Sequence, residues 1–233
     1  MFGLLVVFLL SWGLLAKVAR NPLSVLGIAP TRRRLLELCF GALFLGGVGV
    51  VNFLWQAHFK QIRYEWNPDY GFGRFLGGTF WVWKAVVLEE LVFRGALLYM
   101  LIRAIGAVRA CLLSALLFGI YHWFSYGVFG SRLILMVYIL LVTGAGGWMF
   151  AFAFAKTRSL YLPTGLHLGW NLVAAIVFSE GPLGDQLLLA TGDPVEWSEW
   201  CTLLFFCLQT IVAPGLVTWY LARVYRPSAE PVS

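Results

Sequence analysis

The feature that most constrains this chain is the stretch 88–95, where three formally charged residues interrupt a long apolar run. Glu89, Glu90 and Arg94 stand among Trp, Val, Leu and Phe residues in a run long enough to cross a bilayer. A charge at the centre of a membrane-spanning helix costs roughly 2.5 to 3.5 kcal/mol on insertion scales, and such residues usually mark function. We therefore interpret this stretch as the functional centre of the chain.

Helical spacing predicts different surroundings for the two carboxylates. Glu90 and Arg94 are four residues apart, with the acid nearer the N-terminus, which is the better orientation for an ion pair. Glu89 is rotated by about 100° from Glu90 on the same helix. We predict that one acid is held by Arg94 and that the other faces an apolar pocket, so that they have separate roles.

The composition indicates a polytopic membrane protein. Of the 233 residues, 61% are hydrophobic and 12% are charged, and the mean hydropathy is +0.82. Soluble domains contain about 25% charged residues. Since helices satisfy their own backbone groups in lipid, we predict an all-α transmembrane bundle. The first apolar run has no basic segment before it and no small-residue cleavage site after it, so we expect the first helix to be retained.

Seven apolar runs are long enough to cross about 30 Å of hydrocarbon. No long linker or clear repeat separates them, which predicts a single integral membrane domain over residues 1–233 with a motif-bearing core at about 76–179. The expected spans are 1–16, 36–56, 76–98, 108–124, 133–155, 160–179 and 199–222.

The distribution of basic residues predicts the orientation. With seven crossings, eleven bases fall on one side and four on the other, and the richer side should be cytoplasmic. The N-terminus is then outside and the C-terminus inside, in a plasma (inner) membrane. Because the bases are spread among short loops, they indicate lipid headgroups rather than nucleic acid. The richer side contains Lys17, Arg20, Arg32, Arg33, Arg34, Arg103, Arg109, Lys156, Arg158, Arg223 and Arg226, and the other Lys60, Arg63, Arg74 and Arg132.

Small residues in two spans predict close helix packing, because glycine lets two backbones approach each other. The four cysteines are scattered singly in apolar runs, which is typical of small buried side chains. The glycines concerned are Gly41, Gly46, Gly47 and Gly49 in the second span and Gly144, Gly146 and Gly147 in the fifth.

Two of the three histidines lie inside expected spans. His122 could be an interfacial side chain, and His167 could simply join helices through a hydrogen bond worth about 1 kcal/mol. However, His167 and Asn171 are four residues apart and share a helical face, and the polar residues occur on three different helices. This combination favours function over packing. His58 lies in an expected outer loop, and we assign it no role.

Three short patterns in this order resemble the motifs of a known family. They are Glu89-Glu90-x-x-x-Arg94, Phe118-x-x-x-His122 and His167-x-x-x-Asn171. They are similar to the motifs of the CAAX prenyl endopeptidase and bacteriocin-processing (ABI, or CPBP) family of intramembrane proteases, over roughly residues 83–178. The resemblance implies an endopeptidase that hydrolyses a peptide bond of a membrane-associated protein or peptide.

The resemblance also implies a role for each motif residue. Glu89 and His122 would activate a water molecule, and the oxyanion would be held by His167 and Asn171. Glu90 and Arg94 would form the structural ion pair of the motif helix. A prenylated substrate is implied only by the family name, and a peptide precursor or a sorted surface protein is an equal alternative.

The residues leave open whether the reaction uses a metal ion, and they leave open two functions other than a protease. Glu89, His122 and His167 could bind Zn²⁺ and leave one position for water, but no His-Glu-x-x-His helix is present, so we favour metal-free chemistry. A non-catalytic membrane immunity or binding protein is the second hypothesis. A proton-coupled transporter is the third, because no matching halves with broken spans are evident. The sequence does not predict the oligomeric state.

Overall fold

The computed structural model describes residues 2–225, and this part of the chain is predominantly helical, which confirms the all-α class. The helices group into two compact units. Unit 1 contains residues 2–10, 30–91 and 161–205, and unit 2 contains 11–29, 92–160 and 206–225. The single integral membrane domain stays a prediction. Arg226, one of the bases expected in the cytoplasm, lies outside the described residues.

Unit 1 is organised around the close pairing of two helices, α2 and α7. A Cβ on Gly165 would overlap the carbonyl oxygen of Leu38, and a Cβ on Gly169 would overlap that of Ala42. Only glycine therefore permits this approach. The elements lying wholly or partly in unit 1 are α1 (Phe2–Leu14), α2 (Arg32–Lys60), β1 (Arg63–Trp66), α3 (Phe72–Arg94), α7 (Tyr161–Leu172), the π-helical turn η3 (Val173–Val177), β2 (Leu188–Thr191) and α8 (Glu199–Cys207).

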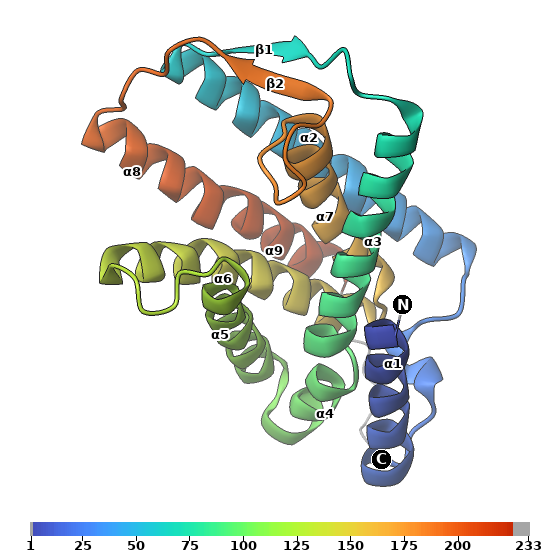
Figure 1. The fold of residues 1–233 in the computed structure, drawn as a ribbon. Helices are drawn as coiled ribbons and strands as arrows, with labels where there is room; N and C mark the ends of the chain where they lie inside the picture. Colours follow the sequence, from blue (N-terminus) through green and yellow to red (C-terminus); the bar gives the residue numbers. More distant parts are fainter. Residues whose placement is uncertain (1, 226–233) are drawn as a thin grey trace. The chain divides into compact units, whose positions relative to one another are not determined.

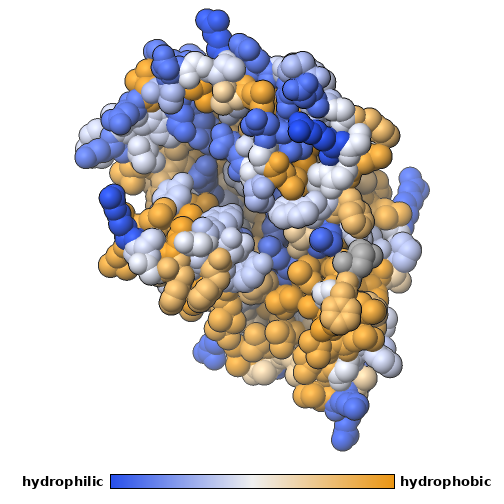
Figure 2. Space-filling model, in the orientation of Figure 1, coloured by the Kyte–Doolittle hydropathy of each residue, from blue (hydrophilic) through white to orange (hydrophobic). Residues whose placement is uncertain are grey.

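Two short strands at one end of unit 1 were not predicted. Strands β1 and β2 pair antiparallel, with Arg63 opposite Thr191, and the loops beside them are rich in hydrophilic residues (Figures 1 and 2). The Asn67 amide donates a hydrogen bond to the Gln186 carbonyl at 2.8 Å, which joins the loop before α3 to the loop after η3. Burial and the Glu180 carboxylate together raise the pKa of Tyr64 in β1 to about 12.

Apolar contacts hold α3 beside the end of the α7–η3 segment. Val82 and Val86 of α3 are buried and form one cluster with Ala175 and Ile176 of η3. A Cβ on Gly78 would lie 2.8 Å from Ile176 Cδ1, so α3 approaches η3 closely here as well. These contacts bring the helix that carries Glu89 and Glu90 alongside the helix that carries His167.

Unit 2 is built on the pairing of α5 with α6. A Cβ on Gly147 of α6 would lie 3.1 Å from Phe118 Cβ of α5, and a Cβ on Gly119 would lie 2.9 Å from the Leu140 carbonyl oxygen. The elements lying wholly or partly in unit 2, besides the ends of α1, α3 and α8, are η1 (Leu15–Ala19), η2 (Leu23–Leu26), α4 (Ala96–Ile105), α5 (Ala107–Ser125), α6 (Leu133–Thr157), η4 (Leu208–Val212) and α9 (Ala213–Val224).

Within the described residues, five helical segments are long and apolar enough to cross a membrane. Large apolar side chains such as Leu43, Leu133 and Trp200 are more than 70% exposed on them, as expected for contact with lipid. The protein is thus an integral membrane protein. The count of seven spans, their orientation and the choice of membrane stay predictions. The five segments are Phe2–Ala19, Arg32–Lys60, Ala107–Ser125, Leu133–Thr157 and Glu199–Val224.

The two other expected spans carry the first and third motifs and differ from the prediction. The stretch 76–98 is not one helix, because α3 ends at Arg94 and α4 begins at Ala96. Gly95 between them has φ −77° and ψ −137°, outside the helical region. The stretch 160–179 consists of the 12-residue helix α7 followed by a π-helical turn. His58, expected in a loop, lies in the last turn of α2.

Candidate active site

The first motif lies at the C-terminal end of α3, where the boundary between the two units falls between residues 91 and 92. Glu89 and Glu90 belong to unit 1, and Arg94 belongs to unit 2. The side chain of Glu90 is 1% exposed and that of Glu89 is 16% exposed. The two adjacent carboxylates therefore differ in burial, as their helical spacing predicts.

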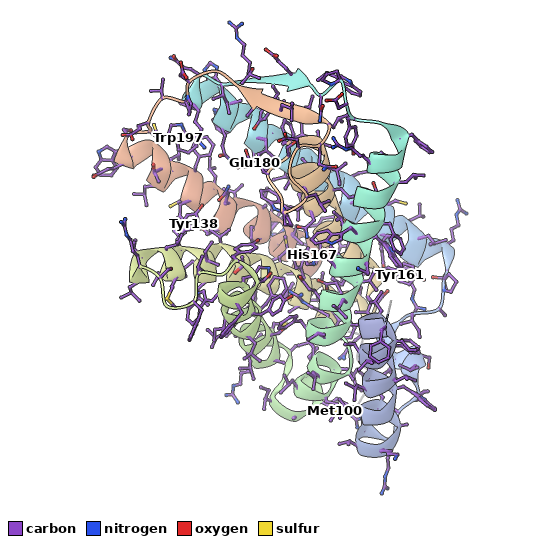
Figure 3. The ribbon with its side chains drawn as sticks, in the orientation of Figure 1. Met100, Tyr138, Tyr161, His167, Glu180 and Trp197 are labelled. Atoms are coloured by element: carbon purple, nitrogen blue, oxygen red, sulfur yellow. The ribbon has the colours of Figure 1, made fainter. Side chains whose placement is uncertain are left out.

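In unit 1, His167 of α7 lies against both carboxylates. Its Nδ1 donates a hydrogen bond to Glu90 Oε1 at 2.8 Å, and its Nε2 lies 3.7 Å from Glu89 Oε2. Figure 3 shows His167 at the place where α7 and the C-terminal half of α3 come together. The structure thus brings together three of the predicted site residues from segments 77 positions apart in the sequence.

The glycines that fix the backbone around His167 were missed in the sequence. Gly165 and Gly169 lie two residues before and after His167, and both face the carbonyl oxygens of α2. Their four-residue spacing is the small-xxx-small pattern of tightly packed membrane helices. That spacing could have identified α2 as the support of this site.

Asn171 lies one turn after His167 on the same side of α7 and is half-buried. Within residues 2–225, its side-chain amide makes no hydrogen bond to another protein group. The amide can therefore donate to a ligand without first breaking an internal bond.

In unit 2, Arg94 is fully buried in an aromatic environment. One guanidinium nitrogen donates a hydrogen bond to the Gly147 carbonyl oxygen at 3.2 Å. The guanidinium carbon lies 4.2 Å from the centre of the Phe118 ring and 5.1 Å from that of Phe150. These distances are within the range of cation–π attraction, so Arg94 joins the end of α3 to both α5 and α6.

His122, also in unit 2, is buried, and its Nδ1 atom makes a hydrogen bond to the backbone. The Nδ1 atom donates a hydrogen bond to the Phe118 carbonyl oxygen at 2.8 Å. The rings of Phe118, Tyr121 and Tyr126 meet the imidazole edge to face, with centroid distances of 4.4 to 5.2 Å. Since a carbonyl can only accept, Nδ1 carries a proton, and the lone pair of a neutral ring is on Nε2.

The ion pair of Glu90 with Arg94 stays a prediction. The contacts described above link Glu90 to His167 within unit 1, and Arg94 to Gly147 and two phenylalanines within unit 2. Each of these residues therefore has a defined role in the packing of its own unit.

A zinc site receives no support from the geometry of the described residues. Over residues 2–225, no group of three or more His, Cys, Asp or Glu side chains is arranged to hold a metal ion. The donor set proposed from the sequence, Glu89, His122 and His167, thus stays an untested alternative.

Buried carboxylates and imidazoles on apolar helices place the protein among integral membrane proteins with a polar site inside the helices. Residues 70–173 match the model of the type II CAAX prenyl endopeptidase Rce1-like family. The matched segment is a little under half of the chain and contains all three motifs, so it supports the suspected family. At the family level the match supports a CAAX-type intramembrane protease, a hydrolase. Comparisons with curated proteins and with solved structures return no match.

Proposed function

We propose that this protein is an intramembrane endopeptidase that hydrolyses a peptide bond with a water molecule activated by Glu89. The main support is the convergence of Glu89, Glu90 and His167 in unit 1, in a part of the chain that matches a peptidase family. The cost of burying these groups in an apolar bundle is consistent with a catalytic use.

Hydrolysis begins when Glu89 takes a proton from water and the water oxygen attacks the scissile carbonyl carbon. The new C–O bond gives a tetrahedral intermediate with negative charge on the former carbonyl oxygen. The C–N bond then breaks, and the proton held by Glu89 passes to the leaving amine nitrogen. One carboxyl terminus and one amino terminus are the products.

His122 assists this step as a hydrogen-bond acceptor. The bond from its Nδ1 to the Phe118 carbonyl leaves the Nε2 lone pair of a neutral ring for the attacking water. The surrounding aromatic rings restrict the orientation of the imidazole. In this role His122 orients the water while Glu89 removes its proton.

His167 and Asn171 stabilise the oxyanion of the intermediate. The Asn171 amide makes no hydrogen bond within the described part of the chain, so its N–H groups are available. His167 donates from Nε2 when both ring nitrogens carry protons. Donors of this kind contribute about 10² to 10³ in rate when they are aimed at the developing charge.

Zn²⁺ is the alternative source of the activated water. A zinc ion bound by Glu89, His122 and His167 would act by polarising its bound water. We favour the metal-free reaction, because the carboxylate of Glu89 supplies the base by itself. A chelator distinguishes the two reactions.

The substrate class that we propose is a membrane-associated protein or peptide in the plasma (inner) membrane. The name of the matched family suggests a prenylated CAAX segment. The test is cleavage of one peptide sequence in liposomes with and without the prenyl group. A preference for the prenylated form supports this substrate, and equal cleavage indicates that only the membrane anchor matters.

The proposed reaction is tested first with the purified protein in liposomes and a pool of membrane peptides. We expect Glu89→Gln to lower kcat by about 1,000-fold, with and without chelator. Glu37→Gln is the matched control, because Glu37 is a buried glutamate on α2 that is paired with Arg33. Undiminished cleavage by Glu89→Gln contradicts the proposal. Loss of wild-type activity in chelator and rescue by zinc favours the metal alternative. If wild type cleaves nothing, the non-catalytic binding protein gains support.

A further inference from the structure

The two ring nitrogens of His167 face two different carboxylates, and only one contact is a close hydrogen bond. Nδ1 lies 2.8 Å from Glu90 Oε1, whereas Nε2 lies 3.7 Å from Glu89 Oε2. A hydrogen bond at the first distance fixes the rotation of the imidazole. The second nitrogen is then directed toward Glu89 at a distance that leaves it outside hydrogen-bonding range.

Burial makes the bond between Glu90 and His167 strong. The side chains are 1% and 6% exposed, so water does not compete for the bond. Inside a low-dielectric protein interior such a bond is electrostatically stronger than the same bond in water.

The backbones that carry the two residues have little freedom to shift. Gly165 and Gly169 hold α7 against the carbonyl oxygens of α2, on both sides of His167. Val82 and Val86 hold α3 against η3, which continues α7. The remaining freedom of His167 is therefore the rotation of its own side chain.

We propose that Glu90 is a positioning residue, which holds Nδ1–H of His167 and thereby directs Nε2 toward Glu89 and the reacting atoms. The inference rests on the proposed function, because it concerns the orientation of a residue in that site. The family resemblance gives Glu90 only a structural partnership with Arg94, whereas here Glu90 acts on the reaction through His167. Glu90 itself touches neither the water nor the substrate.

The kinetic test is Glu90→Gln, which preserves the size of the buried side chain but replaces an acceptor-only group by an amide. The amide can donate as well as accept, so His167 is no longer required to carry its proton on Nδ1. We expect kcat to fall by about 10- to 100-fold, the loss typical when a hydrogen-bond partner that orients a metal-binding histidine is removed, and KM to stay within about twofold, because Glu90 does not bind substrate.

The matched control is again Glu37→Gln, which removes a buried carboxylate from α2 in the same unit. This variant should retain the wild-type kcat. Wild-type kcat in Glu90→Gln overturns the inference, and so does an equal loss in both variants, because that result shows a general effect of removing buried charge.

A spectroscopic test does not depend on cleavage. With ¹⁵N-labelled histidine, the chain gives signals from only three imidazoles, and His58→Gln and His122→Gln identify the signal of His167. We expect Nδ1 of His167 to carry a hydrogen-bonded proton in the wild-type protein and to lose that bond in Glu90→Ala. A wild-type ring with Nδ1 unprotonated overturns the inference, even if Glu90→Gln does not fold.

The two tests also separate this inference from the proposed function. If Glu89→Gln abolishes cleavage while Glu90→Gln cleaves like wild type, the proposed function stands and the positioning role fails. If wild type cleaves no peptide, the proposed function fails, and the ¹⁵N spectrum still decides whether Glu90 orients His167.

Discussion

The two buried motif histidines are held by different kinds of acceptor. In unit 1, His167 donates to the Glu90 carboxylate and also faces Glu89. In unit 2, His122 donates to a backbone carbonyl and is otherwise surrounded by aromatic rings. A carboxylate stabilises a positive charge on an imidazole, whereas a carbonyl only selects its tautomer. The two histidines therefore have different hydrogen-bonding surroundings.

This difference is consistent with the separate roles proposed for the two histidines. A neutral ring with Nδ1–H can accept a hydrogen bond at Nε2, which suits His122 to water. His167 lies against two carboxylates, Glu90 at 2.8 Å and Glu89 at 3.7 Å, and in the proposed reaction it would donate to the oxyanion. Two residues of the first motif support one histidine each. Glu90 makes a hydrogen bond with His167. Arg94 packs on the ring of Phe118, and the carbonyl oxygen of Phe118 accepts the hydrogen bond from His122.

The largest expected effect comes from removing the histidine of unit 2. We expect His122→Ala to lower kcat by about 1,000-fold, because in the proposed reaction the attacking water would lose the hydrogen-bond acceptor that orients it for Glu89. Thermal unfolding in detergent should remain cooperative. His58→Ala is the matched control, since His58 is exposed on α2 and should leave kcat unchanged. Activity retained in His122→Ala would show that unit 2 does not supply a catalytic histidine.

A smaller effect is expected from the arginine that supports unit 2. Arg94→Lys keeps the charge but loses the planar group that stacks on Phe118 and reaches the Gly147 carbonyl. We expect the free energy of unfolding to fall by about 3 kcal/mol, the sum of a charged hydrogen bond and a cation–π contact. Denaturant unfolding measures this change. Arg103→Lys, at an exposed position of α4, should be neutral. Equal stability in the two variants would contradict a packing role for Arg94.

Much of this site could be predicted because polar residues are rare in the spans. The three motifs indicated Glu89, Glu90, Arg94, His122, His167 and Asn171 as site residues. In the structure Glu89 and Glu90 lie against His167, and the catalytic roles stay predictions. The helical class and most helix bounds also followed from apolar run length. For example, α5 spans Ala107–Ser125 where 108–124 was expected.

What could not be predicted depends on contacts between distant segments. Spacing along one helix suggested Arg94 as a partner of Glu90, and that pair stays a prediction, whereas the hydrogen bond between Glu90 and His167 joins residues 77 positions apart and could not be predicted from spacing. Strands β1 and β2 were missed because each has only four residues and they pair across more than a hundred positions. The end of α3 at Arg94 depends on the conformation of a single glycine, Gly95.

The smallest expected effect concerns the support of His167. It tests whether contact with the backbone of α2 supports His167, as contact with the ring of Phe118 supports His122. In Gly169→Ala, the new Cβ meets the Ala42 carbonyl oxygen, which belongs to backbone and cannot rotate away. Overpacking of this kind costs about 1 to 3 kcal/mol, so the free energy of unfolding should fall even though alanine favours a helix. In Gly47→Ala on the exposed face of α2, no atom lies within 4 Å of the new Cβ, and stability should rise by up to about 1 kcal/mol. If denaturant unfolding shows a lower free energy of unfolding for Gly169→Ala and a higher one for Gly47→Ala, the result supports a role of α2 in holding the backbone around His167. If both variants were stabilised, α7 would be free to move away from α2, which would contradict this support of His167.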